Sequence, residues 1–196
     1  AKLMVQRITD AAESVGAKTV VIPECGHAFG VLRWAAANML GRPLPYAVIH
    51  ISEFMAQLKR EGKLKLKPLE ESITYHDPCQ ISRRGGATEE IRYLLQDFAH
   101  DFREMTPSGN FNWCCGGGGG VQAIARAAEL RHKVFKIKMD QVEQTGAETI
   151  VSSCSNCRLT MDESKAHWQW EGGLASLVEI VADHLIEDAK PAEGQP

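Results

Sequence analysis

The sequence predicts an α/β fold with two pseudo-symmetric halves, each a short, mostly parallel sheet flanked by helices. Three observations predict it. Apolar β-branched runs alternate with helical patterns, a segment beginning at Gly16 is repeated at Gly146, and cysteines follow the expected strands. Such alternation is typical of parallel sheets covered by helices. Ligands bind at the carboxyl ends of the strands in these sheets, so we expect the functional site there, between the two halves.

The elements of the first half follow from their local patterns. Leu3, Val5 and Ile8 recur at helical spacing, so a helix is already under way at the first residues. We therefore expect the chain to be the C-terminal part of a longer protein. In chain order, the patterns then predict a strand over Thr19–Ile22, a helix over Ala28–Leu40, a strand over Ala47–His50 and a helix over Ser52–Glu61.

The second half repeats this alternation with longer elements. The patterns predict strands over Ser72–His76, Phe102–Met105 (an edge strand) and Thr149–Val151, and helices over Thr88–Phe98, Val121–Gln144, Cys157–His167 and Leu174–Ile186. The last residues, 188–196, are polar and proline-rich, so we expect a disordered tail.

An internal repeat relates the two halves. Gly16–Val21 matches Gly146–Val151, and each segment is followed within a few residues by a cysteine, Cys25 or Cys154. A unit of helix, strand, cysteine and helix that is used twice indicates two half-domains related by pseudo-symmetry, with chance similarity as the alternative.

The composition excludes several classes of protein. The 196 residues are 44% hydrophobic and 24% charged, which is ordinary for a globular protein and unlike a disordered one. A net charge of −3 provides no overall basic field, so nucleic acid is not an expected partner. No apolar run is long enough to span a bilayer and no leader opens the sequence, so we expect a cytoplasmic protein.

The six cysteines are the most informative residues. Four of them form two closely spaced pairs, Cys114 with Cys115 and Cys154 with Cys157. In a chain of cytosolic character, such pairs are more typical of metal ligands than of disulfides. Five of them follow strands or lie in a glycine-rich loop of the second half: Cys79, Cys114, Cys115, Cys154 and Cys157. A structural zinc takes four ligands. Adjacent residues, with Cα atoms about 3.8 Å apart, suit neighbouring irons of an iron–sulfur cluster better than one zinc. Zinc remains the alternative cofactor.

A glycine run follows the cysteine pair directly. Glycine allows backbone N–H groups to approach closely and form a nest for anionic sulfur. Gly116 and Gly117, the first residues of this run, are therefore candidate cofactor-binding residues; a flexible linker is the alternative.

The spacing Cys-x34-Cys-Cys-Gly-x37-Cys-x2-Cys resembles the cysteine-rich CCG domain of the heterodisulfide reductase catalytic subunit family. Finer details are most similar to the K-type subunits of sulfite-reductase-associated membrane redox complexes, with D-type subunits close behind. The resemblance implies a noncubane [4Fe-4S] cluster on the five cysteines, which reduces a disulfide. It divides the chain into a remnant of a first CCG half-domain (1–70), a second half-domain with the cluster motif (71–187) and the tail (188–196).

The resemblance also implies partners. No ferredoxin-type cysteine motif occurs in the sequence, so electrons are expected from a missing N-terminal region or from other subunits of a redox complex. These are a ferredoxin-type donor and a membrane cytochrome subunit, through which the protein would associate with a membrane. The substrate would be a disulfide or thiol, a small protein among the options. Two alternatives stay open: an electron relay in a 2-hydroxy acid (glycolate or lactate) oxidase complex, and a zinc-stabilised structural module.

Three residues are candidates for catalytic roles. Pseudo-symmetry places Cys25 on the wall of the site opposite the cluster motif, as a substrate contact, an additional ligand or an inert buried thiol. His27 and His76 are candidate proton donors, because histidine titrates near neutral pH; hydrogen-bonded structural histidines are the alternative. The basic residues of the predicted long helix, Lys138 among them, are interpreted as a solvated face.

Overall fold

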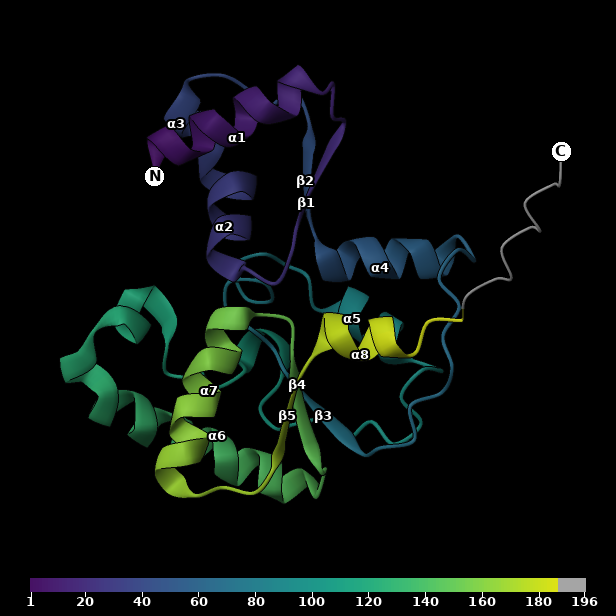
Figure 1. Cartoon of the computed structure of the whole chain (residues 1–196), viewed down its shortest axis with the longest axis vertical. Helices are drawn as coiled ribbons and strands as arrows, with labels where there is room; N and C mark the ends of the chain where they lie inside the picture. The colour runs from purple at the N-terminus through teal and green to yellow at the C-terminus, as the bar shows by residue number, and fades with distance from the viewer. Residues whose placement is uncertain (187–196) are drawn as a thin grey trace, which may run out of the picture.

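Two small parallel sheets with helices packed around them make up the computed structural model, which describes residues 1–186 (Figure 1). The predicted α/β class is confirmed. The predicted disordered tail, 188–196, lies outside the described residues.

The first sheet has two parallel strands, β1 (Thr19–Ile22) and β2 (Ala47–His50), with Thr19 opposite Ala47. Helix α1 (Lys2–Ser14) precedes β1, and α4 (Ile51–Arg60) follows β2. Between the two strands runs one continuous helical segment, which consists of α2 (Gly26–Gly30), a π-helical turn (Val31–Ala35) and α3 (Ala36–Leu40). Helix α4 begins directly after β2 because His50 caps it and the Glu53 carboxylate accepts the His50 N–H, a capping box.

The second sheet has three parallel strands in the order β3-β4-β5: Ile73–His76, Thr149–Ser152 and Gly173–Ser176. Every residue of β3 and β4 is buried, as expected for parallel strands covered on both faces. The helices are α5 (Glu89–Leu95), α6 (Ala128–Thr145), α7 (Ser155–Trp168) and α8 (Leu177–Asp183).

Strand β5 corrects the prediction of a helix from Leu174. Residues 173–176 have little intrinsic preference for a strand, but they pair along the whole of β4. The close approach requires glycine at one end, because a side chain at Gly173 would collide with the Thr149 hydroxyl. Tertiary pairing therefore overrides the local helical pattern, and α8 begins at Leu177.

Two further predictions need correction. The predicted edge strand Phe102–Met105 is reduced to an isolated bridge between Phe102 and Ile73. The predicted helix from Val121 begins as α6 only at Ala128, because residues 118–127 form 3₁₀ turns. Gly119 and Gly120 interrupt that segment with φ angles of 64° and 84°.

The two halves show the same order of elements. The sequence α1-β1-α2/α3-β2-α4 corresponds to α6-β4-α7-β5-α8. The first helix of each is followed within two residues by a glycine with a left-handed φ, 63° at Gly16 and 66° at Gly146. Cys25 is the N-cap of α2, and Cys154 is the N-cap of α7. We propose the boundary near residue 70 on this correspondence, although Met55 of α4 packs in the core of the second half.

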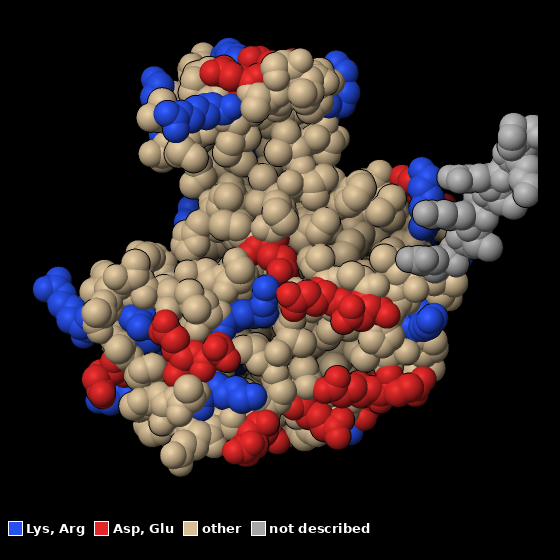
Figure 2. Space-filling model, viewed as in Figure 1, with Lys and Arg blue, Asp and Glu red and all other residues tan. Residues whose placement is uncertain are grey.

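The surface shows no single concentration of basic groups on the face in Figure 2. Lys and Arg side chains there are interspersed with Asp and Glu, and acidic side chains gather over the lower part of the molecule. Within residues 1–186, no helix combines the length and apolar character that crossing a membrane requires.

Candidate metal centre

The five cysteines of the motif come together where the strands of the second sheet end. Cys79 lies three residues after β3, and Cys154 directly precedes α7, which carries Cys157 in its first turn. Cys114 and Cys115 reach the same place from the loop before α6. All five are free thiols; Cys79 and Cys114 are half-buried and the other three are buried. The predicted convergence of the three cysteine groups is therefore present.

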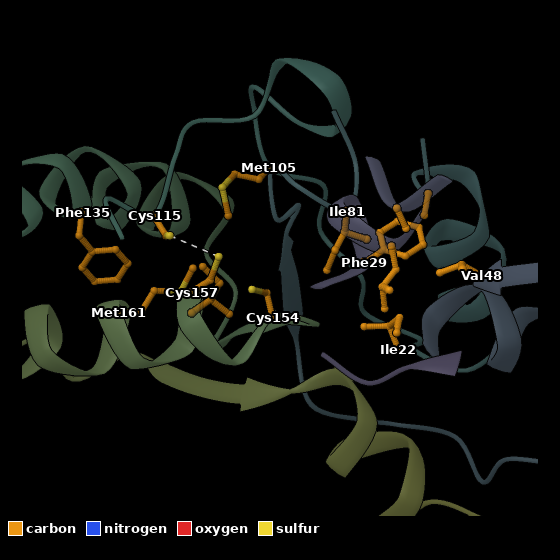
Figure 3. Close-up of a cluster of buried hydrophobic side chains, with 14 of the residues drawn as sticks. Ile22, Phe29, Val48, Ile81, Met105, Cys115, Phe135, Cys154, Cys157 and Met161 are labelled. Atoms are coloured by element: carbon orange, nitrogen blue, oxygen red, sulfur yellow. Dashed lines mark hydrogen bonds between the residues drawn. The ribbon is translucent and has the colours of Figure 1, made fainter. Parts of the chain in front are cut away.

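The thiols form one continuous chain of sulfur contacts. Cys115 Sγ lies 3.3 Å from Cys157 Sγ (Figure 3). Cys114 hydrogen-bonds to both Cys115 and Cys79, and these two contacts hold the pKa of its thiol far below the ordinary value. At the other end, the hydrogen bond from Cys157 lowers the pKa of Cys154 to about 6. These contacts therefore favour the thiolate, the form that binds metals, at two of the five sulfurs.

The same kind of contact raises the pKa of the two intervening thiols, Cys115 and Cys157. The hydrogen bond to Cys114 is the largest effect on Cys115 and raises the pKa of that thiol to about 12. The hydrogen bonds to Cys115 and Cys154, together with burial, raise the pKa of Cys157. A metal or cluster bound here would displace these shared protons, because all of its ligands must be deprotonated.

His76 completes the inner side of the site. It is the last residue of β3, and a ring nitrogen lies within 4.8 Å of the sulfurs of Cys115 and Cys157. The imidazole is buried, and neither ring nitrogen has a hydrogen-bond partner in the described part of the chain. Burial lowers the pKa of His76 to about 3, so the ring is neutral. A buried polar group without a partner is costly and points to a group that the site is built to receive.

The glycine loop provides backbone donors to the cysteine pair. Gly116 N–H donates to Cys114 Sγ at 3.3 Å, and Gly117 N–H donates to Cys115 Sγ at 3.5 Å. A Cβ atom on Gly116 would lie 2.9 Å from the Arg131 carbonyl oxygen, and one on Gly117 would collide with the Thr160 hydroxyl. Both positions therefore require glycine, and their N–H groups meet the sulfurs as expected for a nest.

A buried ion pair holds the cysteine-bearing loops together. The Asp77 carboxylate, which is fully buried, accepts both terminal N–H groups of Arg92 and the Gly109 N–H at 2.6 Å. The Asn112 side chain donates to the Asp77 carbonyl oxygen. Asp77 thereby joins the segment before Cys79 to the segment before Cys114.

The first half meets the cysteine site through Glu24 and Gly26. The Glu24 carbonyl oxygen accepts the Ser155 N–H at 2.8 Å, and its carboxylate accepts from Arg158 at 2.6 Å and from Ser176 at 2.8 Å. The Gly26 N–H donates to Cys154 and helps to lower its pKa. The cysteine site therefore lies at the junction of the two halves.

Two predicted catalytic residues lie outside the thiol chain. Cys25 Sγ accepts the Ala28 N–H at 3.5 Å as the N-cap of α2, and the half-buried side chain packs against the same core as Cys114. His27 lines an apolar cavity with residues of α1, including Met4 and Ile8, and its buried Nε2 has no hydrogen-bond partner in residues 1–186. The structure does not bring His27 to the thiols.

Sequence reasoning missed Lys138, which it assigned to a solvated face. Lys138 and Arg131 are both buried in α6. The signal was present in the helical spacing, because Lys138 shares one stripe of the helix with Phe135, Met139 and Val142, which are also buried.

Five thiols and an unpartnered imidazole at the strand ends of a parallel sheet define an α/β protein with a candidate thiolate-ligated metal centre. The family comparison agrees with that class. Residues 73–162 match the CCG cysteine-rich domain, a range that contains all five cysteines. This part of the chain is therefore a CCG cysteine-rich domain, and the resemblance predicted from the spacing is confirmed.

Three of the similar proteins are named as oxidoreductases or as subunits of them. Over 94% of its length, the chain is 31% identical to the D-type subunit of a dihydromethanophenazine:CoB–CoM heterodisulfide reductase from Methanosarcina barkeri, of which it covers 45%. It is 31% identical to an EtfAB:quinone oxidoreductase from Syntrophomonas wolfei, covering 81% of this chain and 22% of the relative. An Hdr-like menaquinol oxidoreductase iron–sulfur subunit from Archaeoglobus profundus is 24% identical, covering 95% of this chain and 40% of the relative. The chain thus spans less than half the length of these relatives, which are redox proteins.

Proposed function

We propose that this chain is the cluster-binding part of a heterodisulfide-reductase-like subunit that transfers electrons to or from a disulfide or thiol substrate. The observation that carries the proposal is the continuous chain of five thiols, which extends from half-buried Cys79 to buried Cys154. Four thiols would satisfy a structural zinc, whereas five thiolates suit a cluster of several irons.

The residues fit a [4Fe-4S] cluster of the noncubane type. Its proposed ligands are Cys79, Cys114, Cys115, Cys154 and Cys157. When bound, such a cluster supplies electrons one at a time to a disulfide. The N–H groups of Gly116 and Gly117 already point at two of the ligand sulfurs, where they would stabilise anionic sulfur.

The burial of the ligands favours one side for substrate access. Cys115, Cys154 and Cys157 are buried, while Cys79 and Cys114 are half-buried. We expect a substrate sulfur to approach from the side of Cys79 and Cys114. Reduction of a disulfide consumes two electrons and two protons and yields two thiols, so the site must supply protons as well as electrons.

His76 and Cys25 are the residues proposed to assist. The neutral, unpartnered imidazole of His76 can donate one N–H hydrogen bond to sulfur within the site. Cys25 remains a candidate substrate contact, because it caps α2 at the junction where the Gly26 N–H reaches Cys154. His27, which lies against α1, is not included in the proposed reacting centre.

Electrons would come from outside these 196 residues. We propose that the chain works with other subunits or segments of a redox complex, including a ferredoxin-type donor and a membrane cytochrome subunit. The support is that the relatives include named subunits and that the chain covers 45% of the heterodisulfide reductase subunit. Association with a membrane would then depend on those partners.

Electron paramagnetic resonance of the cluster-loaded protein tests the substrate step. We expect the spectrum to change when 2-mercaptoethanol or 2-hydroxyethyl disulfide is added, because sulfur would reach the site from the half-buried side. Ethylene glycol, which carries no sulfur, serves as the matched control and should leave the spectrum unchanged. A spectrum that is unchanged by both sulfur compounds would contradict the substrate step and would favour a role as an electron relay.

A further inference from the structure

Lys138 carries a buried charge beside the cysteines. Its side chain is 0% exposed, and its hydrogen bond within residues 1–186 runs from Nζ to Met105 Sδ at 3.1 Å. A thioether is a weak acceptor, and a lysine is almost never fully buried without an anionic partner. The ammonium therefore lacks the partner that its burial demands.

The charges that face Lys138 belong to the cysteine site. Those that favour its protonated form are, in order of influence, Asp77, Cys115, Cys114 and Cys157. The Asp77 carboxylate is already held by Arg92 and by the Gly109 N–H. His76 also interacts with Lys138, because the positive charge of Lys138 helps to lower the pKa of the imidazole. The thiols are thus the one group of potential anions near Lys138 that accepts no hydrogen bond from a basic side chain in the described structure.

The surroundings of Met105 agree with this placement. Met105, Cys115 and Cys157 belong to one buried cluster, and Figure 3 shows Met105 facing the sulfurs of that pair. Burial lowers the pKa of Lys138 to about 8, which still leaves the amine mostly protonated at neutral pH.

We propose that Lys138 is the built-in counter-charge of the thiolate site, a positioning residue that stabilises the added electron of the bound cluster and so raises its reduction potential. The inference rests on the proposed function, since it needs an anionic cluster on the cysteines. Local charge and hydrogen bonding are what set the potential of a given cluster type.

Two other basic residues of α6, Arg131 and Lys136, are paired elsewhere. Arg131, also buried, donates to the carbonyl oxygens of Val121 and Ile124 and pairs with Glu163 at 3.0 Å. The Lys136 side chain is 43% exposed and pairs with Asp140 at 2.7 Å. Lys136 therefore provides a matched control on the same helix, two residues away.

The test is a redox titration of the anaerobically loaded protein, followed by electron paramagnetic resonance. Lys138→Met keeps the length of the side chain and removes the charge. We expect its one-electron reduction to be at least tenfold less favourable, a fall in midpoint potential of about 59 mV. Lys136→Met should leave the midpoint potential unchanged. Lys138→Arg, which keeps the positive charge, should have a midpoint potential close to that of wild type.

The outcomes separate this inference from the proposed function. A Lys138→Met protein with normal iron content and an unchanged potential would overturn the inference alone. A wild-type protein that binds no iron would overturn the proposed function. The free energy of unfolding of the metal-free reduced protein would then test whether Lys138 carries an uncompensated charge. Without a cluster the buried ammonium keeps only the Met105 thioether as a hydrogen-bond partner in residues 1–186, so Lys138→Met should be more stable than wild type; a less stable variant would show that the chain itself compensates the charge.

Discussion

Cys115→Ser is expected to lose most of the bound iron and the visible absorbance of the cluster. Cys115 occupies the middle of the thiol chain, between Cys114 and Cys157, and it is 2% exposed. A serine oxygen is harder and more basic than a thiolate, so it is a poor ligand for an iron–sulfur cluster. Iron analysis and the visible spectrum of protein loaded without oxygen measure the loss.

Cys25→Ser is the matched control for that experiment. Cys25 is half-buried and caps α2, outside the chain of five thiols. Its replacement by serine should therefore leave the iron content unchanged. Equal iron content in Cys115→Ser and wild type would show that the ligand assignment is wrong, and loss of iron in Cys25→Ser would make Cys25 a ligand.

Asp77→Asn is expected to destabilise the cluster-free protein by about 2–4 kcal/mol. Three N–H donors face the Asp77 carboxylate, two from Arg92 and one from Gly109. An amide provides one oxygen acceptor and turns its own N–H₂ group toward a donor, so the partly buried Arg92 charge would keep only the more exposed Glu104 as its counter-ion. Urea unfolding under reducing conditions at neutral pH measures the change.

Asp101→Asn provides the comparison at the surface. Asp101 forms a two-point ion pair with Arg103 just as Asp77 does with Arg92, but the side chains of Asp101 and Arg103 are 44% and 39% exposed. Water replaces an exposed ion pair at little cost, so this variant should unfold close to wild type. If Asp77→Asn were as stable as Asp101→Asn, the buried pair would not be what holds the Cys79 and Cys114 loops together.

Strong periodic patterns and the cysteine spacing were sufficient for much of the fold and the site. Strands such as Ala47–His50 were predictable because an apolar β-branched run in an α/β chain has few alternatives. The convergence of the cysteines followed from a topological rule, since parallel strands end at one edge. Strand β5 was missed because its residues become a strand only through pairing with β4, which no local pattern records.

The electrostatics of the site could not be predicted in the same way. Lys138 belongs to a basic stretch that also contains exposed residues such as Lys133, and charge alone assigned all of them to solvent. The role of Asp77 depends on Arg92, fifteen positions away, and on Gly109, thirty-two positions away. Such contacts arise from tertiary structure, so they appear only when the loops are placed in space.

Analysis of metal and acid-labile sulfide in anaerobically prepared protein tests the central claim most directly. The five-thiol site predicts a brown protein with about four irons and four sulfides per chain, since it is assigned a [4Fe-4S] cluster. A colourless protein that holds about one zinc and no sulfide per chain would contradict the claim and would favour a structural metal site.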